Sequence, residues 1–243
     1  MTAIIIKGRQ IISGGGNNQS SFRNFILSLN PTAYYPMDEL TGNTCFDLIA
    51  NRHGIYPANA VLNQESLLVG NQTSKSVVFP TSTNPIVIPY TFTNTDFTIG
   101  GLVKPSLLLK NIIFSVNLSL NGNRAELSAL FGTTNHANRG NIFLGLSQNV
   151  SFYNPSFAYN VGQSPIFVVM RLSSNILSYF INGVKTIEVS TSGDNGNSPA
   201  GTNQIVFGSF PSFVSDNINL SEIFFFNSAL TDQVINNINS NRF

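Results

Sequence analysis

The sequence predicts an all-β protein built as an antiparallel sandwich with two short helices. About a dozen short β-type runs are separated by regular turn signals, as in antiparallel sandwiches. Strands and helices do not alternate along the chain, which excludes a nucleotide-binding α/β fold. The length of 243 residues is one that all-β sandwiches reach as single units. We therefore expect one large domain with a core of its own.

The first 21 residues differ from the rest and predict an extended N-terminal arm. Two short β-type runs, Thr2–Ile6 and Gln10–Ser13, precede a flexible joint at Gly14–Gly16. We divide the chain into this arm, residues 1–21, and a domain, residues 22–243. The arm is predicted to dock on a neighbouring protein by adding a strand to it, through Thr2, Ala3, Ile4, Ile5 and Ile6.

Two helices are expected, one at each end of the domain. The first is predicted from apolar residues at helical spacing, with a cap at Ser20 or Ser21 and an end at Pro31; its apolar face holds Phe22, Phe25, Ile26 and Leu29. The closing helix is capped by Thr231 or Ser228, and its apolar stripe holds Val234, Ile235 and Ile238.

Between the helices the sequence is almost wholly strand and turn. Ile166–Arg171 is a β-branched and aromatic run, suited to a central strand that is buried on both faces. Asn182–Gly183 between two β-rich runs is the strongest hairpin signal, because both central residues of a type I′ turn need a positive φ. Further strands are expected at Phe97–Val103, Asn111–Leu120, Asn141–Leu146, Gln204–Gly208 and Asn217–Asn227.

Composition excludes several classes of partner and site. Charged residues make up 9% of the chain and the net charge is +1, so no basic patch for nucleic acid is expected. Asn is the most frequent residue, and Asn, Ser and Thr replace Lys and Glu as the polar surface. The single Cys45 excludes a disulfide framework and is expected to be a small buried residue. We predict no membrane span and no secretory signal.

Three separated segments resemble a known family. The first is Asn30–Gly54, with an aromatic pair at Tyr34-Tyr35, an acidic pair at Asp38-Glu39, and then Gly42, Asp47, Asn51 and Gly54. The second is Phe97-Thr-Ile-Gly-Gly-Leu-Val-Lys-Pro105, and the third comprises Leu177–Gly183 and Ile218–Asp232. Together they resemble the laminin-G-like domains of bacteria and phages, in the concanavalin A-like lectin/glucanase superfamily.

This resemblance implies a jelly-roll sandwich of the concanavalin A type over roughly residues 22–240. The fold hosts lectins, hydrolases, adhesion modules and virion proteins, so the resemblance alone leaves the function open. Hydrolases of the superfamily usually carry a Glu-x-Asp-x-Glu strand, which this sequence lacks.

We expect no enzymatic activity and no cofactor. Glycoside hydrolysis needs two carboxylates that flank the bond, and the adjacent Asp38 and Glu39 of a strand would face opposite sides. His53 and His136 are the only histidines, and neither lies in a recognisable catalytic motif.

Asp38, Glu39 and Glu222 match the family's acidic positions and allow two interpretations. They could contact a cation or ligand, or they could accept backbone N–H bonds and pair with Arg, tying terminal strands together. We favour the structural interpretation, above all for Glu222, which adjoins an apolar run and is expected to be buried and hydrogen-bonded.

A glycan site is predicted from amide side chains beside aromatic rings. The candidates are Asp194, Asn195 and Asn197 in a Gly-rich polar loop, with Tyr153 and Tyr159 in another polar stretch; the alternative is that these tyrosines are half-buried strand residues. Oxygen-rich side chains would also suit Ca²⁺, but one carboxylate supplies little charge, so no metal is expected there.

The expected function is that of a structural and interaction protein on a virion surface, such as a phage capsid decoration, head-fibre or tail-associated subunit. Its arm would dock on other virion proteins, and its lectin-like domain would attach to host surface polysaccharide. The alternative is a lectin or adhesion module that is not part of a virion. A homo-oligomer is expected, because such surface proteins are usually symmetric.

Overall fold

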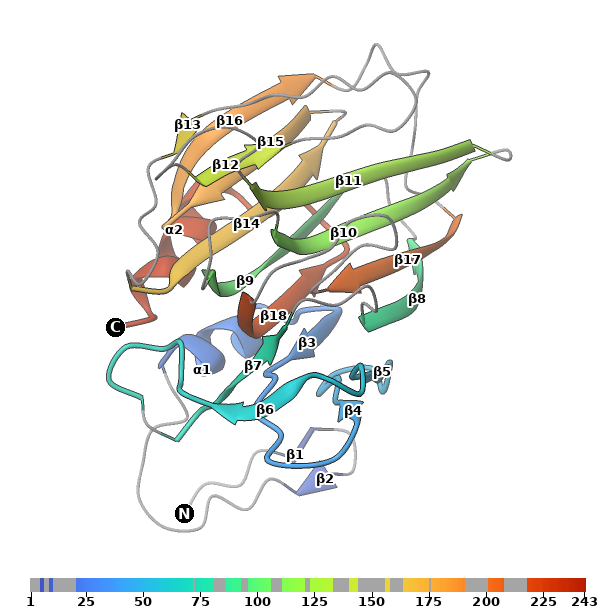
Figure 1. Ribbon diagram of the computed structural model, residues 1–243. Coiled ribbons are helices and arrows are strands. Elements are labelled where there is room, and N and C mark those ends of the chain that lie inside the picture. Colours follow the sequence, from blue (N-terminus) through green and yellow to red (C-terminus); the bar gives the residue numbers. More distant parts are fainter. Residues whose placement is uncertain are drawn as a thin grey trace.

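The structure is a computed structural model that describes residues 5–6, 9–10, 21–71, 73–80, 86–92, 96–105, 111–120, 123–132, 140–143, 156–157, 164–174, 176–190, 201–207 and 218–243. These residues form two packed antiparallel sheets with two short helices on one outer face (Figure 1). The predicted antiparallel sandwich is therefore confirmed. Within the described ranges, no helix has both the length and the apolar character that crossing a bilayer requires.

The larger sheet has eight strands: β3 (Ala33–Tyr35), β6 (Val61–Gln64), β7 (Ser76–Phe79), β9 (Phe97–Pro105), β14 (Ile166–Ser173), β15 (Ile176–Ile181), β16 (Val184–Ser190) and β18 (Ile218–Phe226). Their order is β16-β15-β14-β9-β18-β7-β6, and β3 also pairs with β18. The first and last strands of the domain are therefore neighbours.

The smaller sheet has six strands: β8 (Ile86–Phe92), β10 (Asn111–Leu120), β11 (Asn123–Gly132), β12 (Gly140–Phe143), β13 (Ser156–Phe157) and β17 (Gly201–Phe207). Their order is β13-β12-β11-β10-β17-β8. Two ribbons stand apart from these sheets: β1 (Ile5–Ile6) with β2 (Arg9–Gln10), and β4 (Thr44–Cys45) with β5 (Gly54–Ile55).

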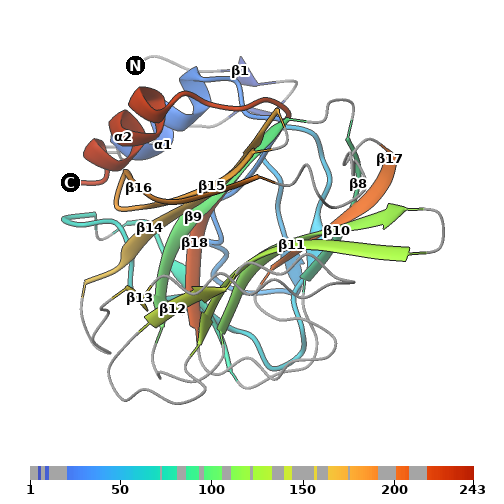
Figure 2. The same ribbon diagram turned by 90° about the horizontal axis from the view of Figure 1, so that it is seen from above.

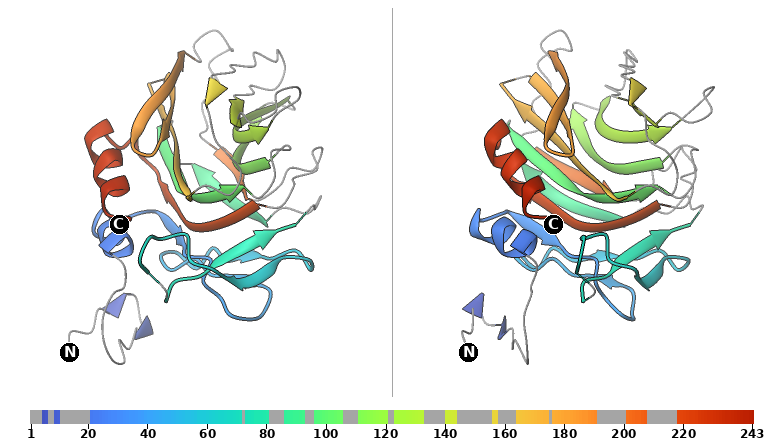
Figure 3. Two further views of the ribbon diagram at one scale, coloured as in Figure 1. Left: turned by 60° about the vertical axis from the view of Figure 1, so that its left-hand side comes forward. Right: turned by 90° about the vertical axis from the view of Figure 1, so that its left-hand side faces the viewer.

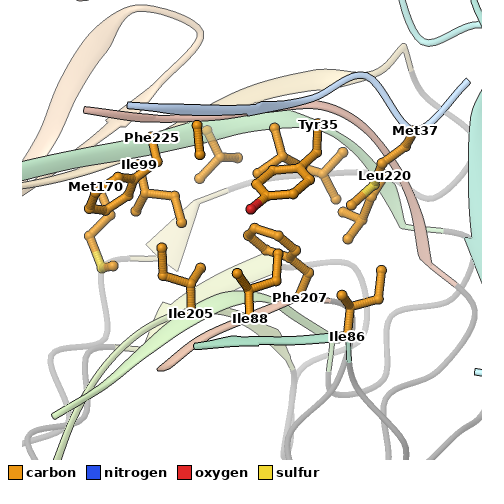
Figure 4. Packing of buried hydrophobic residues seen from close by; sticks show 14 of the residues in the cluster. Tyr35, Met37, Ile86, Ile88, Ile99, Met170, Ile205, Phe207, Leu220 and Phe225 are labelled. Atoms are coloured by element: carbon orange, nitrogen blue, oxygen red, sulfur yellow. The ribbon is translucent and has the colours of Figure 1, made fainter. Parts of the chain in front are cut away.

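The main core fills the space between the two sheets. Tyr35 and Phe225 of the larger sheet face Ile205 and Phe207 of the smaller one (Figure 4). The rings of Tyr35 and Phe207 meet edge to face, with their centroids 5.3 Å apart. Such aromatic pairs stabilise a sandwich beyond the area they bury.

Helices α1 (Ser21–Ser28) and α2 (Asp232–Ser240) create a second apolar layer on the outer face of the larger sheet (Figure 2). Phe22 and Ile26 of α1 and Ile235 and Ile238 of α2 are fully buried against it. Both predicted helices are confirmed, and Thr231 is the cap of α2, since its side chain accepts the Val234 N–H.

The predicted central strand and hairpin are confirmed as well. β14 is buried from Ile166 to Met170, between β15 and β9. Asn182 and Gly183 join β15 to β16 with φ values of 51° and 80°. Gly183 is also needed for space, since a Cβ there would lie 2.9 Å from Asn236 Oδ1 of α2. The hairpin turn therefore packs closely against α2 at Gly183.

Candidate ligand-binding face and buried ionic clusters

The predicted glycan residues Asp194, Asn195, Asn197, Tyr153 and Tyr159 lie outside the described residues, as do Thr2, Ala3 and Ile4 of the arm. The strands that adjoin the glycan candidates are described, and all belong to the smaller sheet. Asp194–Asn197 precedes β17, which begins at Gly201, whereas Tyr153 and Tyr159 flank β13.

These adjoining strand ends lie at opposite corners of the smaller sheet. β17 and β13 are four strands apart, which is about 19 Å across the sheet. By register, Gly201 is level with Asn123 of β11, whereas Ser156 of β13 is level with Gly132, about 30 Å further along the strands. The glycan site built from these loops stays a prediction.

The register of the smaller sheet collects polar residue types on one face. Ile205 and Phe207 of β17 are buried in the core, so the alternate positions belong to the opposite face. We call these positions the outer polar face: Ser115, Asn117 and Ser119 on β10, Arg124, Glu126 and Ser128 on β11, and Thr202, Gln204 and Val206 on β17. Val87, the β8 partner of Val206, is 39% exposed, which confirms that this face points away from the core.

The two sheets differ in what lies on their outer faces. The larger sheet carries both helices, whereas the smaller sheet lies on the other side of the molecule (Figure 3). Among the described elements, both helices pack on the larger sheet and neither packs on the outer polar face.

A bulge in β18 places a charged residue beneath α1. Between Ser221 and Phe224 the pairing with β9 shifts, and Glu222 adopts a φ of 55°. A left-handed residue in such a bulge is usually Gly. The bulge lets Leu220 and Ile223 both face the main core while Glu222 lies under α1.

Glu222 lies in a buried cluster with Arg23, Asp38 and Tyr34. Its carboxylate, fully buried, accepts hydrogen bonds from the Tyr34 hydroxyl and from Arg23 Nη2, the latter at 2.8 Å. Asp38 Oδ2 lies 2.9 Å from the same Arg23 nitrogen. Burial raises the pKa of Glu222, and Arg23 opposes this shift. For Arg23, burial works to lower the pKa, but Glu222 and Asp38 together raise it. The favoured structural interpretation of Asp38 and Glu222 agrees with these contacts.

Asp47 fixes the loop that follows β4. Its carboxylate accepts the backbone N–H groups of Tyr34, Ile49, Ala50 and Arg52 at 2.9–3.2 Å. The side chain is almost fully buried, so these charge-assisted bonds satisfy its charge. Asp47 is thus a structural anchor for this loop.

Glu39 has a similar role at the β4–β5 ribbon. It accepts the Phe46 N–H at 2.8 Å and the Tyr56 hydroxyl at 2.6 Å. Burial raises the pKa of Tyr56 and that of Cys45 beside it, so both stay protonated. Cys45 is fully buried, as predicted, in a setting that disfavours the reactive thiolate.

A third group of charges fastens α2. Arg171 of β14 lies 2.5 Å from Asp232 in the first turn of α2, donates to the Leu230 carbonyl and stacks over the Phe180 ring. Lys185 of β16 lies 2.6 Å from Glu188, also on β16, and 3.4 Å from Asp232. Among the residues whose placement is described, no three His, Cys, Asp or Glu side chains are grouped to hold a metal ion.

Sequence reasoning missed the partners of these carboxylates. Arg23 and Glu222 are 199 residues apart, and Arg171 and Asp232 are 61 apart. One signal was present in the sequence. Arg23 directly follows Phe22, a core position of the predicted helix, so the backbone at Arg23 is expected to lie close to the sheet. A second signal was the alternation of polar and apolar residues in β10, which predicts that one face of this strand is polar.

Comparisons with known proteins give a likeness of fold. No family model and no curated protein matches the chain. A Trypanosoma rangeli sialidase in complex with 2,3-difluorosialic acid is similar over 87% of this chain, with a TM-score of 0.66 and 13% identity. The botulinum neurotoxin serotype D binding domain is similar over 89% of this chain, with a TM-score of 0.60 and 11% identity. The chain spans about a third of the sialidase and about half of the toxin domain.

Proposed function

We propose that the chain is a non-enzymatic surface subunit of a virus particle of the phage type, whose lectin-like domain attaches to glycans on the host surface. In this proposal the sandwich is a jelly roll of the concanavalin A-like superfamily. The subunit is a capsid decoration, head-fibre or tail-associated protein, and it forms a homo-oligomer.

The outer polar face is the observation that carries the proposal. Six of its nine positions are hydroxyl or amide residues, Val206 is apolar, and Arg124 and Glu126 offset each other in charge. Neutral sugars are bound through hydrogen bonds to such groups, which the strands of a sheet hold at fixed spacing. The face extends across three neighbouring strands, which suits an extended polysaccharide.

The similar structures support a binding role. One is the receptor-binding domain of botulinum neurotoxin D, with a TM-score of 0.60 and 12% identity. In that protein the shared fold is part of a receptor-binding domain, and in the sialidases it accounts for about a third of an enzyme chain. We propose the binding role, and not the enzymatic one, for this chain.

Most described carboxylates form hydrogen bonds or ion pairs within the protein, which supports the non-enzymatic part of the proposal. Hydrolysis of a glycosidic bond requires two carboxylates that face the sugar. Most carboxylates whose side chains are described accept a hydrogen bond or an ion pair from the protein itself: Asp38, Glu39, Asp47, Asp96, Glu188, Glu222 and Asp232. They stabilise loops and helices, so the proposal gives them no catalytic role.

The test is calorimetric binding of the full chain to purified host-envelope polysaccharide. The Asn117→Ala/Gln204→Ala double variant is expected to lose binding at least about tenfold, from two lost hydrogen bonds. The matched control is Asn237→Ala, which lies on the exposed side of α2. Unchanged binding by the double variant would refute the assignment to the outer polar face.

Variants of the two predicted loops locate the site further. If Asp194→Ala or Tyr153→Ala abolishes binding while Asn117→Ala/Gln204→Ala does not, a loop site replaces the outer polar face. Loss of binding with EDTA would show that a metal is needed, with Asp194 as the first candidate ligand.

The alternative is a lectin or adhesion module outside a virion, and the likeness to a toxin binding domain favours it. The two proposals share the glycan site and differ in assembly. A virion subunit is expected to be abundant in purified particles, whereas a free adhesin binds the same glycan but is missing from particles.

A further inference from the structure

The β4–β5 ribbon lies beside β8 at one edge of the sandwich and has an inner and an outer face (Figure 1). Its strands pair Thr44 with Ile55 and Cys45 with Gly54. Cys45 and Gly54 are buried, and a Cβ on Gly54 would overlap Ile86 of β8, so this pair forms the inner face. Thr44 and Ile55 therefore belong to the outer face, where Ile55 is 60% exposed.

The outer face continues with two aromatic rings. Phe46 follows Cys45 and His53 precedes Gly54, and their rings meet edge to face with the centroids 5.0 Å apart. His53 is exposed, and Phe46 is 36% exposed. We call the four outer residues the ribbon face: Thr44, Phe46, His53 and Ile55.

An exposed aromatic ring sets this face apart from the rest of the domain. All tyrosines whose side chains are described are buried: Tyr34, Tyr35, Tyr56, Tyr90 and Tyr179. Among the described side chains, Phe46 and Phe243 are the exposed phenylalanines. The Arg242 guanidinium lies over the Phe243 ring, 4.7 Å from its centroid. Phe46 instead adjoins an imidazole, with a hydroxyl and an aliphatic side chain on the same small surface.

A backbone contact determines the tautomer of neutral His53. Its Nδ1 accepts the Asp47 N–H at 3.0 Å, so the ring proton is on Nε2, which points away from that contact. The Asp47 carboxylate accepts four backbone N–H groups, so the imidazole rests on an anchored loop. A ligand on the ribbon face therefore meets an N–H donor of fixed direction beside the Phe46 ring.

The charged groups near the ribbon face are engaged by the protein itself. Glu39 accepts hydrogen bonds from the Phe46 N–H at 2.8 Å and from the Tyr56 hydroxyl at 2.6 Å. Arg52 donates to the Thr32 carbonyl at 3.2 Å. An ionic ligand would have to compete for these charges, whereas an uncharged ligand needs only the ring, the aliphatic side chain and the hydrogen-bonding groups.

The size of the ribbon face fits a sugar better than a protein. Its two residue levels are about 7 Å apart along the strands, which are themselves about 5 Å apart. Specific protein interfaces use about 20–30 residues a side and bury about 800 Å² on each partner. A sugar ring has C–H groups on one face and hydroxyls around its rim. It can therefore pack on Phe46 and Ile55 while one of its oxygens accepts the His53 Nε2–H.

We propose that the ribbon face is an aromatic subsite for one uncharged sugar residue of a glycan. Phe46 is the platform for the sugar ring, Ile55 packs beside it, and His53 donates to a sugar oxygen. The inference rests on the proposed function in that the ligand is a glycan. It adds an aromatic contact to the polar positions of the outer polar face. The ribbon lies beside β8, the neighbour of β17 in the smaller sheet, so one polysaccharide can contact both.

The test is calorimetric titration of the full chain with purified host-envelope polysaccharide. Phe46→Leu keeps an apolar side chain but removes the ring, and it is expected to weaken binding about tenfold. Phe46→Trp supplies a larger ring and should bind at least as tightly as the native chain. The matched control is Phe243→Leu, which removes the other exposed ring and should leave the affinity unchanged. Native affinity in Phe46→Leu, or an equal loss in Phe243→Leu, would overturn the proposal.

Nuclear magnetic resonance of the native chain gives a second readout that needs no variant to bind. The chain is labelled with carbon-13 in the phenylalanine rings, and uncharged oligosaccharides released from the same polysaccharide are added. The Phe46 ring signals, assigned by their loss in Phe46→Leu, are expected to shift while those of Phe243 stay in place. Unshifted Phe46 signals at saturating oligosaccharide would reject the subsite.

The Asn117→Ala/Gln204→Ala variant separates this inference from the proposed function. If that variant loses affinity and Phe46→Leu does not, the outer polar face stands and the ribbon subsite is wrong. If Phe46→Leu loses affinity and the double variant does not, the ribbon face is the glycan site and the outer polar face is not. Failure of the native chain to bind the polysaccharide would refute both.

Discussion

Replacing Arg23 with Met is expected to be among the most destabilising single changes in the helical layer. Glu222 is fully buried, and its carboxylate is held by Arg23 and by the Tyr34 hydroxyl. In the Arg23→Met variant the charge of Glu222 would have no counter-ion. Leaving such a charge buried costs about 3–5 kcal/mol of the free energy of unfolding.

The converse change, Glu222→Gln, is expected to cost less. Arg23 would keep Asp38, whose carboxylate lies 2.9 Å away, so no buried charge is left alone. The loss is then that of a charge-assisted hydrogen bond, about 1.5–3 kcal/mol. The double variant Arg23→Met/Glu222→Gln should be more stable than Arg23→Met alone, because it removes the isolated charge.

Urea unfolding at two pH values tests this reasoning. Burial raises the pKa of Glu222, so its charged form costs stability above that pKa and the cost is relieved as the pH falls through it. Without Arg23 the pKa rises further. The deficit of Arg23→Met, meaning its loss of unfolding free energy relative to the native chain, is therefore expected to be smaller at about pH 5 than at about pH 8. A deficit below about 1 kcal/mol at the higher pH, or one equal at both, would refute the argument.

Three further predictions concern packing, the loop anchor and the second helix. Gly101→Ala should lower the free energy of unfolding by about 1–3 kcal/mol, since its Cβ would lie 2.3 Å from Ile223 Cδ1; a thermal melt like that of the native chain would contradict this. Asp47→Ala should lower the free energy of unfolding, measured with urea, by about 3 kcal/mol, because four backbone N–H groups lose their acceptor. The control Glu65→Gln, at an exposed position, should lower it by less than about 0.5 kcal/mol. Arg171→Met should loosen α2, seen as faster amide exchange in its first turn, and equal exchange rates in both proteins would disprove that role.

Local sequence patterns were sufficient to predict the elements that bury one apolar face or form a tight turn. The helix at residues 21–28 followed from the spacing of Phe22 and Ile26, and the hairpin from Asn182–Gly183, whose positive φ values few other residues adopt. The full burial of Glu222 was also predicted, because a carboxylate beside an apolar run must be hydrogen-bonded. For the helix and the hairpin the deciding interactions lie within a few residues, whereas the partners of Glu222 are far away in the sequence.

The rest depends on contacts between distant residues, which a single sequence does not reveal. Glu222 adopts a left-handed φ that its residue type disfavours, in a bulge where it pairs with Arg23 and where Leu220 and Ile223 both face the main core. The outer polar face likewise needs the register between β10, β11 and β17. Strand order and register are set by tertiary packing, so the polar alternation of one strand does not show which strands it joins.

The ion pairs of the described residues gather on the helix-covered side of the domain. The ion pairs found among the described residues lie in or beside α1 and α2, where Arg23 meets Glu222 and Arg171 meets Asp232. Each helix is thus fastened to the larger sheet by one arginine, and the chain segments beside Ser21 and Asn241 lie together on that side, joined by a hydrogen bond of 2.8 Å. The start of α1 and the end of α2 therefore meet on the helix-covered side of the domain. The smaller sheet lies on the other side, and the positions of its outer polar face include one Arg and one Glu, whose formal charges cancel, so the glycan site that we propose there lies away from both helices and their ion pairs.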